Sequence, residues 1–165
     1  MVNRILSHEQ IQHKIKRIAY QIYEANVNEN EIIVAGIVGG GLNLAKKIAN
    51  VLKKITDAEI VLCQLEMDKK NPLKSGVSTS IPEEAYQNKS IVVVDDVLNS
   101  GTTLIYGVHH FLKTPIKQLK TAVLVNRNHK KYPVKADYKG ISLSTSLNEH
   151  IKVEFQGKND TVYLE

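Results

Sequence analysis

The sequence predicts an α/β fold in which a central, mostly parallel β-sheet is flanked by helices on both faces. Short, continuous apolar runs such as 32–37 and 91–94 alternate along the chain with longer segments of helical periodicity. Unbroken apolar strands that alternate with helices are typical of parallel sheets buried on both sides. Glycine-containing turns follow both runs. Because such sheets bind ligands at the carboxyl ends of their strands, we expect the functional site at these two turns.

Length and composition agree with one soluble domain over residues 1–165. Of the 165 residues, 42% are hydrophobic and 24% are charged, as in an ordinary globular protein. Residues 1–7 lack an apolar signal core and no run approaches membrane-spanning length, so we expect a cytoplasmic protein without membrane contact. The single cysteine, Cys63, excludes an intramolecular disulfide. A net charge of +5 admits phosphorylated metabolites or nucleic acid as partners and does not choose between them.

The first half of the chain predicts helix, strand, helix and strand in that order. Ser7 and Gln10 have the spacing of a capping box at a helix start. The helix that follows has apolar residues at helical spacing, namely Ile11, Ile15, Ile18, Ile22 and Tyr23. The run 32–37 predicts a buried strand, residues 42–54 a helix, and 60–65 a second strand.

Residues 67–84 show neither helical nor strand periodicity. The segment contains Lys69, Lys70, Pro72, Gly76 and several serines. An irregular stretch of this length inside a compact domain is usually a functional lid or a disordered loop. We interpret it as a lid over the expected site.

The second half repeats the alternation of strand and helix. The run 91–94 predicts a buried strand that ends abruptly at Asp95 and Asp96. A helix is predicted over 102–113 and another buried strand over 119–125. Shorter strand-like pieces follow around Tyr138, Val153 and Val162.

The first glycine turn, Gly39–Gly41, lies between a predicted strand and a predicted helix. Consecutive glycines let backbone N–H groups face an anion, and the helix N-terminus adds partial positive charge. Taken alone, the turn is equally consistent with a structural role in which glycine permits tight packing between strand and helix.

The second turn, 94–103, is far more specific. Adjacent carboxylates at the end of a buried strand, Asp95 and Asp96, are costly unless a cation or hydroxyl groups bind them. Residues 99–103 supply hydroxyl groups, a glycine and a helix start, which suit a phosphate monoester. Ordinary turn or capping roles account for either carboxylate but not for the combination. Parallel strands bring both turns to one edge, which indicates a single sugar ligand with phosphates at both ends.

Residues 92–103 resemble the signature of type I phosphoribosyltransferases: an apolar strand, two acidic residues, a short loop and Gly-x-Thr. The likeness covers most of the chain, with the lid segment as the main exception. The segments similar to the family of pyrimidine-operon attenuation regulators and uracil phosphoribosyltransferases are Arg17–Ala19, Gly36–Ile37, Leu44–Lys46, Asp95–Leu98, Ala122–Val125 and Ala136–Gly140. This resemblance implies the type I phosphoribosyltransferase fold, with a flexible lid at about 67–84 and a small C-terminal hood mainly over 126–165.

The resemblance also implies a site for phosphoribosyl pyrophosphate and Mg²⁺. Asp95 and Asp96 would be the catalytic pair, binding the ribose hydroxyls and helping to place Mg²⁺. The glycine turn would bind pyrophosphate, the loop 99–103 the 5′-phosphate, and residues 142–145 of the hood the base. The substrate-binding residues so implied are Val38, Gly39, Gly40, Gly41, Val97, Leu98, Asn99, Ser100, Gly101, Thr102, Thr103, Ser142 and Leu143. The family further implies a homodimer or a higher homo-oligomer.

The implied reaction displaces pyrophosphate from the anomeric carbon through a state with oxocarbenium character. Mg²⁺ and the backbone donors of the first loop would stabilise the leaving group, and a closed lid would exclude water. Lys69 or Lys70 would add positive charge from the lid, although a solvated loop explains these lysines as well. Gly40 stands where the regulator family has an arginine, and residues 67–70 lack that family's lid motif of tyrosine, arginine and two aspartates.

Asn99 bears on the choice of base. In the similar enzymes that act on 6-oxopurines, an aspartate at this position exchanges a proton with the purine, which asparagine cannot do. We therefore expect a pyrimidine base, uracil first, with UMP and pyrophosphate as products.

The alternative function is an RNA-binding regulator that senses nucleotides through the same pocket. Basic residues occupy the positions where that family contacts RNA, namely Lys14, Lys16, Arg17, His129, Lys130, Lys131 and Lys135. Tyr20 replaces a family histidine, however, and lysines replace arginines, which removes the forked geometry needed for sharper recognition. We therefore interpret these side chains as a solvated surface and favour the enzyme.

Overall fold

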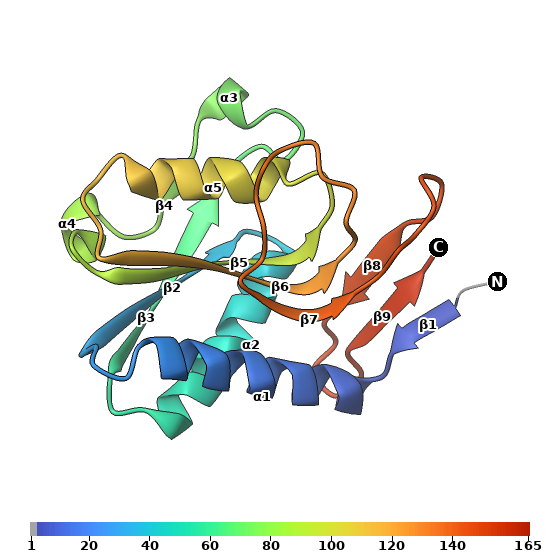
Figure 1. The fold of residues 1–165 in the computed structure, drawn as a ribbon, viewed down its shortest axis with the longest axis horizontal. Coiled ribbons are helices and arrows are strands. Elements are labelled where there is room, and N and C mark those ends of the chain that lie inside the picture. Colours follow the sequence, from blue (N-terminus) through green and yellow to red (C-terminus); the bar gives the residue numbers. More distant parts are fainter. Residues whose placement is uncertain (1–2) are drawn as a thin grey trace.

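The computed structural model describes residues 3–165 and is built around a six-stranded sheet (Figure 1). Its order is β4 (Ser78–Thr79), β3 (Glu59–Glu66), β2 (Glu31–Ile37), β5 (Ser90–Leu98), β6 (Gln118–Asn126) and β7 (Tyr138–Ser142). Neighbouring strands from β3 to β7 are parallel, and only the short edge strand β4 is antiparallel to its neighbour. The predicted α/β class with a mostly parallel sheet is therefore confirmed.

Helices cover both faces of this sheet. α1 (His8–Ala25) and α2 (Gly40–Ile55) lie on one face, and α5 (Thr102–Leu112) with the short α4 (Glu83–Tyr86) lies on the other (Figure 1). Successive residues of β2 alternate between the two cores: Val34 packs with α1 and α2, and Ala35 packs with α5. Burial on both sides explains why these strands read as unbroken apolar runs.

The capping box predicted at the start of α1 is present. Ser7 N donates to Gln10 Oε1 at 2.9 Å, and Gln10 N donates to Ser7 Oγ at 3.3 Å. The helix buries its predicted apolar face except for Tyr23, which is partly buried. Among the helices of residues 3–165, none combines the length and the apolar character needed to cross a bilayer.

A second, antiparallel sheet contains three strands in the order β1 (Asn3–Leu6), β9 (Thr161–Leu164) and β8 (Ile151–Glu154). It stands beside the main sheet and holds the described ends of the chain next to each other (Figure 1). β1 was not predicted, because a strand of four residues is too short to show a reliable pattern before its partner is known. β7, within the range expected for the hood, is instead the last strand of the main sheet.

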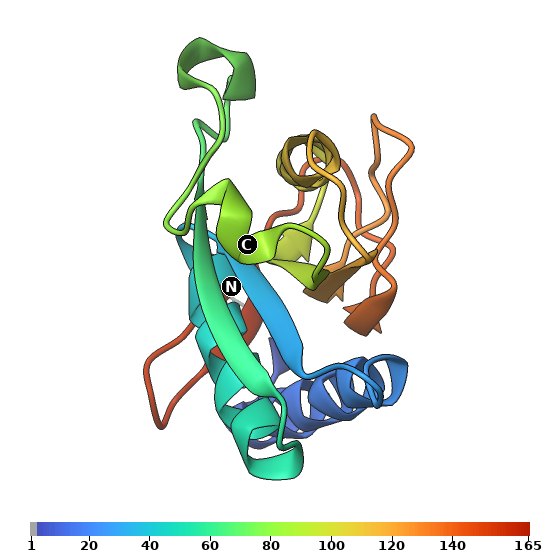
Figure 2. The same ribbon diagram turned by 90° about the vertical axis from the view of Figure 1, so that its left-hand side faces the viewer.

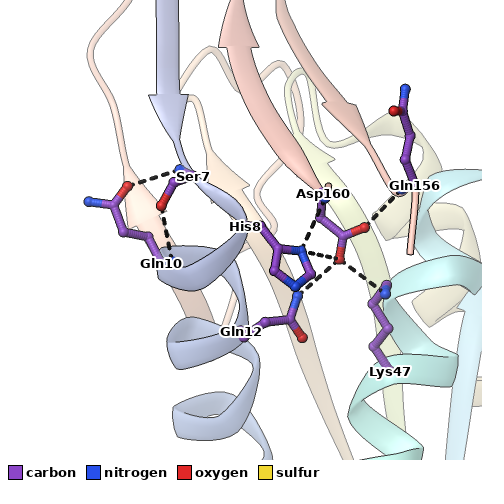
Figure 3. Close-up of polar contacts among 7 residues, drawn as sticks. All are labelled: Ser7, His8, Gln10, Gln12, Lys47, Gln156 and Asp160. Carbon is purple, nitrogen blue, oxygen red and sulfur yellow. Dashed lines mark hydrogen bonds and ion pairs between the residues drawn. The ribbon is translucent and has the colours of Figure 1, made fainter. Parts of the chain in front are cut away.

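The buried carboxylate of Asp160 joins the second sheet to α1 and α2 (Figure 3). Its Oδ2 accepts a hydrogen bond from Gln12 Nε2 at 2.9 Å and pairs with Lys47 Nζ at 3.1 Å. Its Oδ1 accepts from Gln156 N at 2.8 Å, and its own N–H donates to His8 Nδ1 at 3.1 Å. One side chain thus connects the loop before β9 to two helices of the main domain.

Part of the segment 67–84 has regular structure, so the prediction of an irregular stretch was wrong there. β4 returns to the sheet edge and pairs with β3 through Leu65↔Thr79 and Glu66↔Ser78. Between these strands lies the one-turn helix α3 (Pro72–Ser75), which projects beyond the sheet (Figure 2). Elements of two and four residues are set by tertiary pairing and carry no periodic signal of their own.

Candidate active site

The site lies where the chain changes direction across the sheet. β2 and β5 are adjacent and parallel, with Ala35 opposite Val93 and Gly36 opposite Val94. From β2 the chain passes to α2 on one face, and from β5 to α5 on the other. The carboxyl ends of two such strands form the crevice in which open α/β sheets bind ligands.

The glycine turn after β2 packs directly against the end of β5. A Cβ on Gly41 would lie 2.8 Å from Val94 O and 3.0 Å from the Cα of Asp95, closer than side chains allow. Gly39 precedes α2 with φ of +107°, a conformation that favours glycine. The tight-packing role considered for this turn is real, and it also brings the turn beside the acidic pair.

Asp95 and Asp96 lie within β5, which continues to Leu98, so the prediction that the strand ends at these residues was wrong. Continued pairing with β6, including Asp95 opposite Val123, keeps the strand extended. Asp95 is only 3% exposed; its Oδ2 accepts a hydrogen bond from Thr103 Oγ1 and its Oδ1 from Asp96 N, both at 2.9 Å. Burial, with the neighbouring Asp96 charge second, raises the pKa of Asp95 to about 7, and Lys69 opposes this rise.

Asp96 is oriented toward the glycine turn. Its Oδ1 accepts a hydrogen bond from Val97 N at 2.9 Å. Its Oδ2 lies 2.0 Å from the position of a Cβ on Gly40. Within residues 3–165, Oδ2 accepts no hydrogen bond, so this oxygen is available to a ligand.

The loop after β5 forms the N-terminus of α5. Gly101, with φ of +86°, is the N-cap residue, and the Ser100 and Thr102 hydroxyls lie 2.8 Å apart. Lys131 N donates to Ser100 O at 2.7 Å, which fixes the loop from outside. Free N–H groups at a helix start and two hydroxyls form a cradle suited to an anion.

These groups line one cavity of about 450 Å³. Its walls are Lys69, Lys70, every residue from Asp95 to Thr103, and Ile151. Gly39 lies beside it, since a Cβ there would be 3.4 Å from Lys69 Nζ. Ser142 and Leu143 are not among the walls, and Leu143 N donates to Asn126 O at 2.9 Å.

Arg127 is a further site residue, absent from the sequence-based predictions. The residue is 7% exposed and follows β6. Its guanidinium reaches Asn99 of the cavity wall and the loop 145–149 that precedes β8. Its position, directly after a buried strand and next to the expected hood, was the available signal.

The acidic pair fits Mg²⁺ only as part of a larger ligand set. Within residues 3–165 no three His, Cys, Asp or Glu side chains form a group that could hold a metal. Two carboxylates, one with an available oxygen, match the usual arrangement in which Mg²⁺ keeps several waters and is bound by one or two carboxylates together with substrate phosphates.

Comparison with known proteins identifies the family. The family model described as phosphoribosyl transferase domain matches residues 1–157. The chain belongs to the phosphoribosyltransferase family. Bifunctional protein PyrR of Streptomyces coelicolor is 31% identical over 97% of this chain and 88% of its own length. Bifunctional protein PyrR of Streptococcus pneumoniae (strain CGSP14) is also 31% identical, over 91% of this chain and 88% of its own.

Solved phosphoribosyltransferases share the fold. A hypoxanthine-guanine phosphoribosyltransferase from Bacillus anthracis superposes with a TM-score of 0.72 at 24% identity, covering 86% of this chain and 82% of its own. A Trypanosoma cruzi hypoxanthine phosphoribosyltransferase reaches 0.77 at 17% identity, covering 96% and 94%. The predicted resemblance, the type I phosphoribosyltransferase fold and the assignment as a phosphoribosyltransferase enzyme are confirmed.

Proposed function

We propose that this phosphoribosyltransferase converts uracil and phosphoribosyl pyrophosphate to UMP and pyrophosphate, with Mg²⁺ as cofactor. The observation that carries the proposal is the convergence on one cavity of the acidic pair of β5 and the helix start of α5, beside the glycine turn. A ligand with a phosphate at each end and hydroxyls between them matches these three groups in chemistry and in order.

The loop 99–103 is proposed to bind the 5′-phosphate. Its backbone N–H groups at the start of α5, with the Ser100 and Thr102 hydroxyls, supply several donors and no negative charge. Such a helix start favours a dianion through both hydrogen bonds and the helix dipole.

The acidic pair is proposed to bind the ribose hydroxyls. Asp96 Oδ2 is available as an acceptor, whereas both oxygens of Asp95 already accept hydrogen bonds that hold the carboxylate in place. Mg²⁺, when bound, would supply positive charge to the leaving pyrophosphate. Lys69 and Lys70 reach the cavity from the lid, and we propose that they add charge to the same leaving group.

The choice of uracil rests on Asn99, which lines the cavity where a carboxylate would serve a 6-oxopurine. A carboxamide neither accepts nor releases a proton near neutral pH. A base that needs no such proton exchange is favoured, and we propose that residues 142–145 lie on the base side of the closed site.

The RNA-binding alternative finds less support in the arrangement of the basic residues. Arg17 Nη2 is bound to the carbonyls of Lys139 and Gly140, and His129 Nε2 lies 2.7 Å from Thr145 O. The segment 129–135 packs on the α5 side of the sheet, whereas α1 covers the opposite face (Figures 1 and 2). Within the part of the chain that the structure describes, the two sets of cations therefore do not form one continuous face.

The experiment is a turnover assay with uracil, hypoxanthine, guanine and adenine, run beside titration of labelled RNA hairpins at several salt concentrations. We expect Mg²⁺-dependent formation of UMP and no sequence-dependent RNA binding. Turnover of a purine but not uracil contradicts the assignment of the base. Salt-sensitive, sequence-dependent hairpin binding without turnover selects the regulator.

We further propose a cytoplasmic homodimer or higher homo-oligomer. Analytical ultracentrifugation across a concentration series tests the assembly, and a monomer at all concentrations contradicts it. Cell fractionation tests the location.

A further inference from the structure

The guanidinium of Arg127 is almost fully engaged by the loop that precedes β8. Its Nε donates to Thr145 Oγ1 at 2.7 Å, and its Nη2 donates to the backbone carbonyls of Ser146, at 2.9 Å, and Glu149. The residue is 7% exposed, and within residues 3–165 no carboxylate lies within ion-pair distance of it. These contacts hold the guanidinium in one orientation.

The remaining nitrogen, Nη1, is directed at the wall of the cavity. It donates to Asn99 Oδ1 at 3.3 Å. A guanidinium has only donors, so it can face the oxygen of a carboxamide but not its nitrogen. The orientation of the Asn99 amide is therefore set by the chemistry of its partner, without reference to which end fits better.

With its oxygen turned toward Arg127, Asn99 presents its nitrogen on the other side. Among residues 3–165, Asn99 Nδ2 donates to no protein acceptor, and Asn99 lines the cavity. A free carboxamide N–H at a cavity wall needs an acceptor from the ligand or from water.

We propose that Arg127 is a positioning residue that holds Asn99 with its N–H donors in the cavity, so that the enzyme selects bases presenting a lone pair there. This inference rests on the proposed function and deepens it. A carbonyl oxygen of a pyrimidine such as uracil meets the requirement without proton exchange. A base that presents an N–H at this point would meet a donor instead of an acceptor and bind poorly.

Asn99→Asp tests the donor directly, because it replaces the N–H group by an oxygen of nearly the same shape and leaves Arg127 a partner. We expect the KM for uracil to rise roughly tenfold, as for loss of one hydrogen bond, while the KM for phosphoribosyl pyrophosphate changes less than about twofold. The matched control is Asn148→Asp, the same substitution at an exposed residue of the nearby loop, which should change neither constant by more than about twofold.

Arg127→Gln tests the positioning role, because glutamine can accept as well as donate and so lets the Asn99 amide turn over. We expect the KM for uracil to rise roughly three- to tenfold, and Lys131→Gln, which removes an exposed positive charge nearby, to have no such effect. In the double variant with Asn99→Leu, the rise should equal that of Asn99→Leu alone, because both changes remove one interaction.

Several results would overturn the inference. Asn99→Asp may leave the KM for uracil unchanged, or the change may fall on phosphoribosyl pyrophosphate, which would direct the amide at the phosphate. Independent, multiplying effects of Arg127→Gln and Asn99→Leu would separate the two residues. Should Arg127→Gln fail to fold, Asn99→Asp against Asn148→Asp decides alone. Wild-type protein that turns over no base and binds no UMP by calorimetry defeats the proposed function and this inference together, whereas uracil turnover insensitive to Asn99 defeats only the inference.

Discussion

Gly40 lies directly against the carboxylate of Asp96, and a Cβ on Gly40 would be 2.0 Å from Asp96 Oδ2. The nearest atom belongs to the end of a side chain, so Gly40→Ala should displace the carboxylate rather than the backbone. Alanine is also favoured over glycine in a helix by roughly 0.5–1 kcal/mol, which offsets the contact. We expect unchanged thermal stability and roughly tenfold weaker binding of phosphoribosyl pyrophosphate by calorimetry. The control is Asn43→Ala, an exposed change in the first turns of the same helix, and equal affinities for both variants would contradict the role of Asp96.

Asp95 should make the free protein less stable as the pH rises. Its pKa in the folded state is raised to about 7 from 3.8, mainly by burial and then by Asp96. Between these values the folded state binds more protons than the unfolded state, so stability falls as the pH rises from about 4 to about 7 and then levels. Each pKa unit corresponds to about 1.4 kcal/mol, so the effect amounts to a few kcal/mol.

Asp95→Asn removes this titration, so urea denaturation at pH 4.5–8 should show the variant gaining on the wild type as the pH rises. The same variant should lose the stabilisation that phosphoribosyl pyrophosphate with Mg²⁺ confers on the wild type. A stability difference that is constant over this pH range would show that Asp95 does not titrate as described.

Lys69 opposes the acidic pair and lines the cavity, whereas Lys74 is an exposed residue of α3. Lys69→Gln should lower kcat/KM for phosphoribosyl pyrophosphate roughly tenfold, because the leaving group loses a nearby cation. It should also raise the pKa of Asp95 further and shift the loss of stability to higher pH. Lys70→Gln should act in the same direction on kcat/KM, and Lys74→Gln should leave it within about twofold. Equal behaviour of all three variants would reduce the lid lysines to a solvated loop.

The ion pair between Asp160 and Lys47 should contribute strongly to stability, because Asp160 is fully buried. Asp160→Ala leaves Lys47, Gln12 and two backbone N–H-bearing segments without their partner, and we expect a loss of roughly 3 kcal/mol in the free energy of unfolding. Lys117→Gln breaks a pair of similar length, 2.7 Å, in which the lysine is largely exposed, and should cost under about 1 kcal/mol. Chemical denaturation of both variants gives the comparison, and equal losses would contradict the role of burial.

Local sequence determined much of the frame of this protein. The capping box of α1, the apolar strands 32–37 and 119–125 and the helices after β2 and β5 depend on neighbours in the chain, so their patterns are readable without the fold. The loop 95–103 was readable for the same reason, since its carboxylates, hydroxyls and glycine follow one another.

Tertiary structure alone decided what connects segments far apart in sequence. β1 exists because β9 pairs with it, and β5 continues through its two aspartates because β6 pairs alongside. Arg127, one of three arginines in the chain, is ordinary in sequence, and becomes a site residue because the loop 145–149 surrounds it and Asn99 faces it. Backbone pairing and buried hydrogen bonds act over distance in space rather than distance along the chain, and no local pattern encodes the partner of a lone side chain.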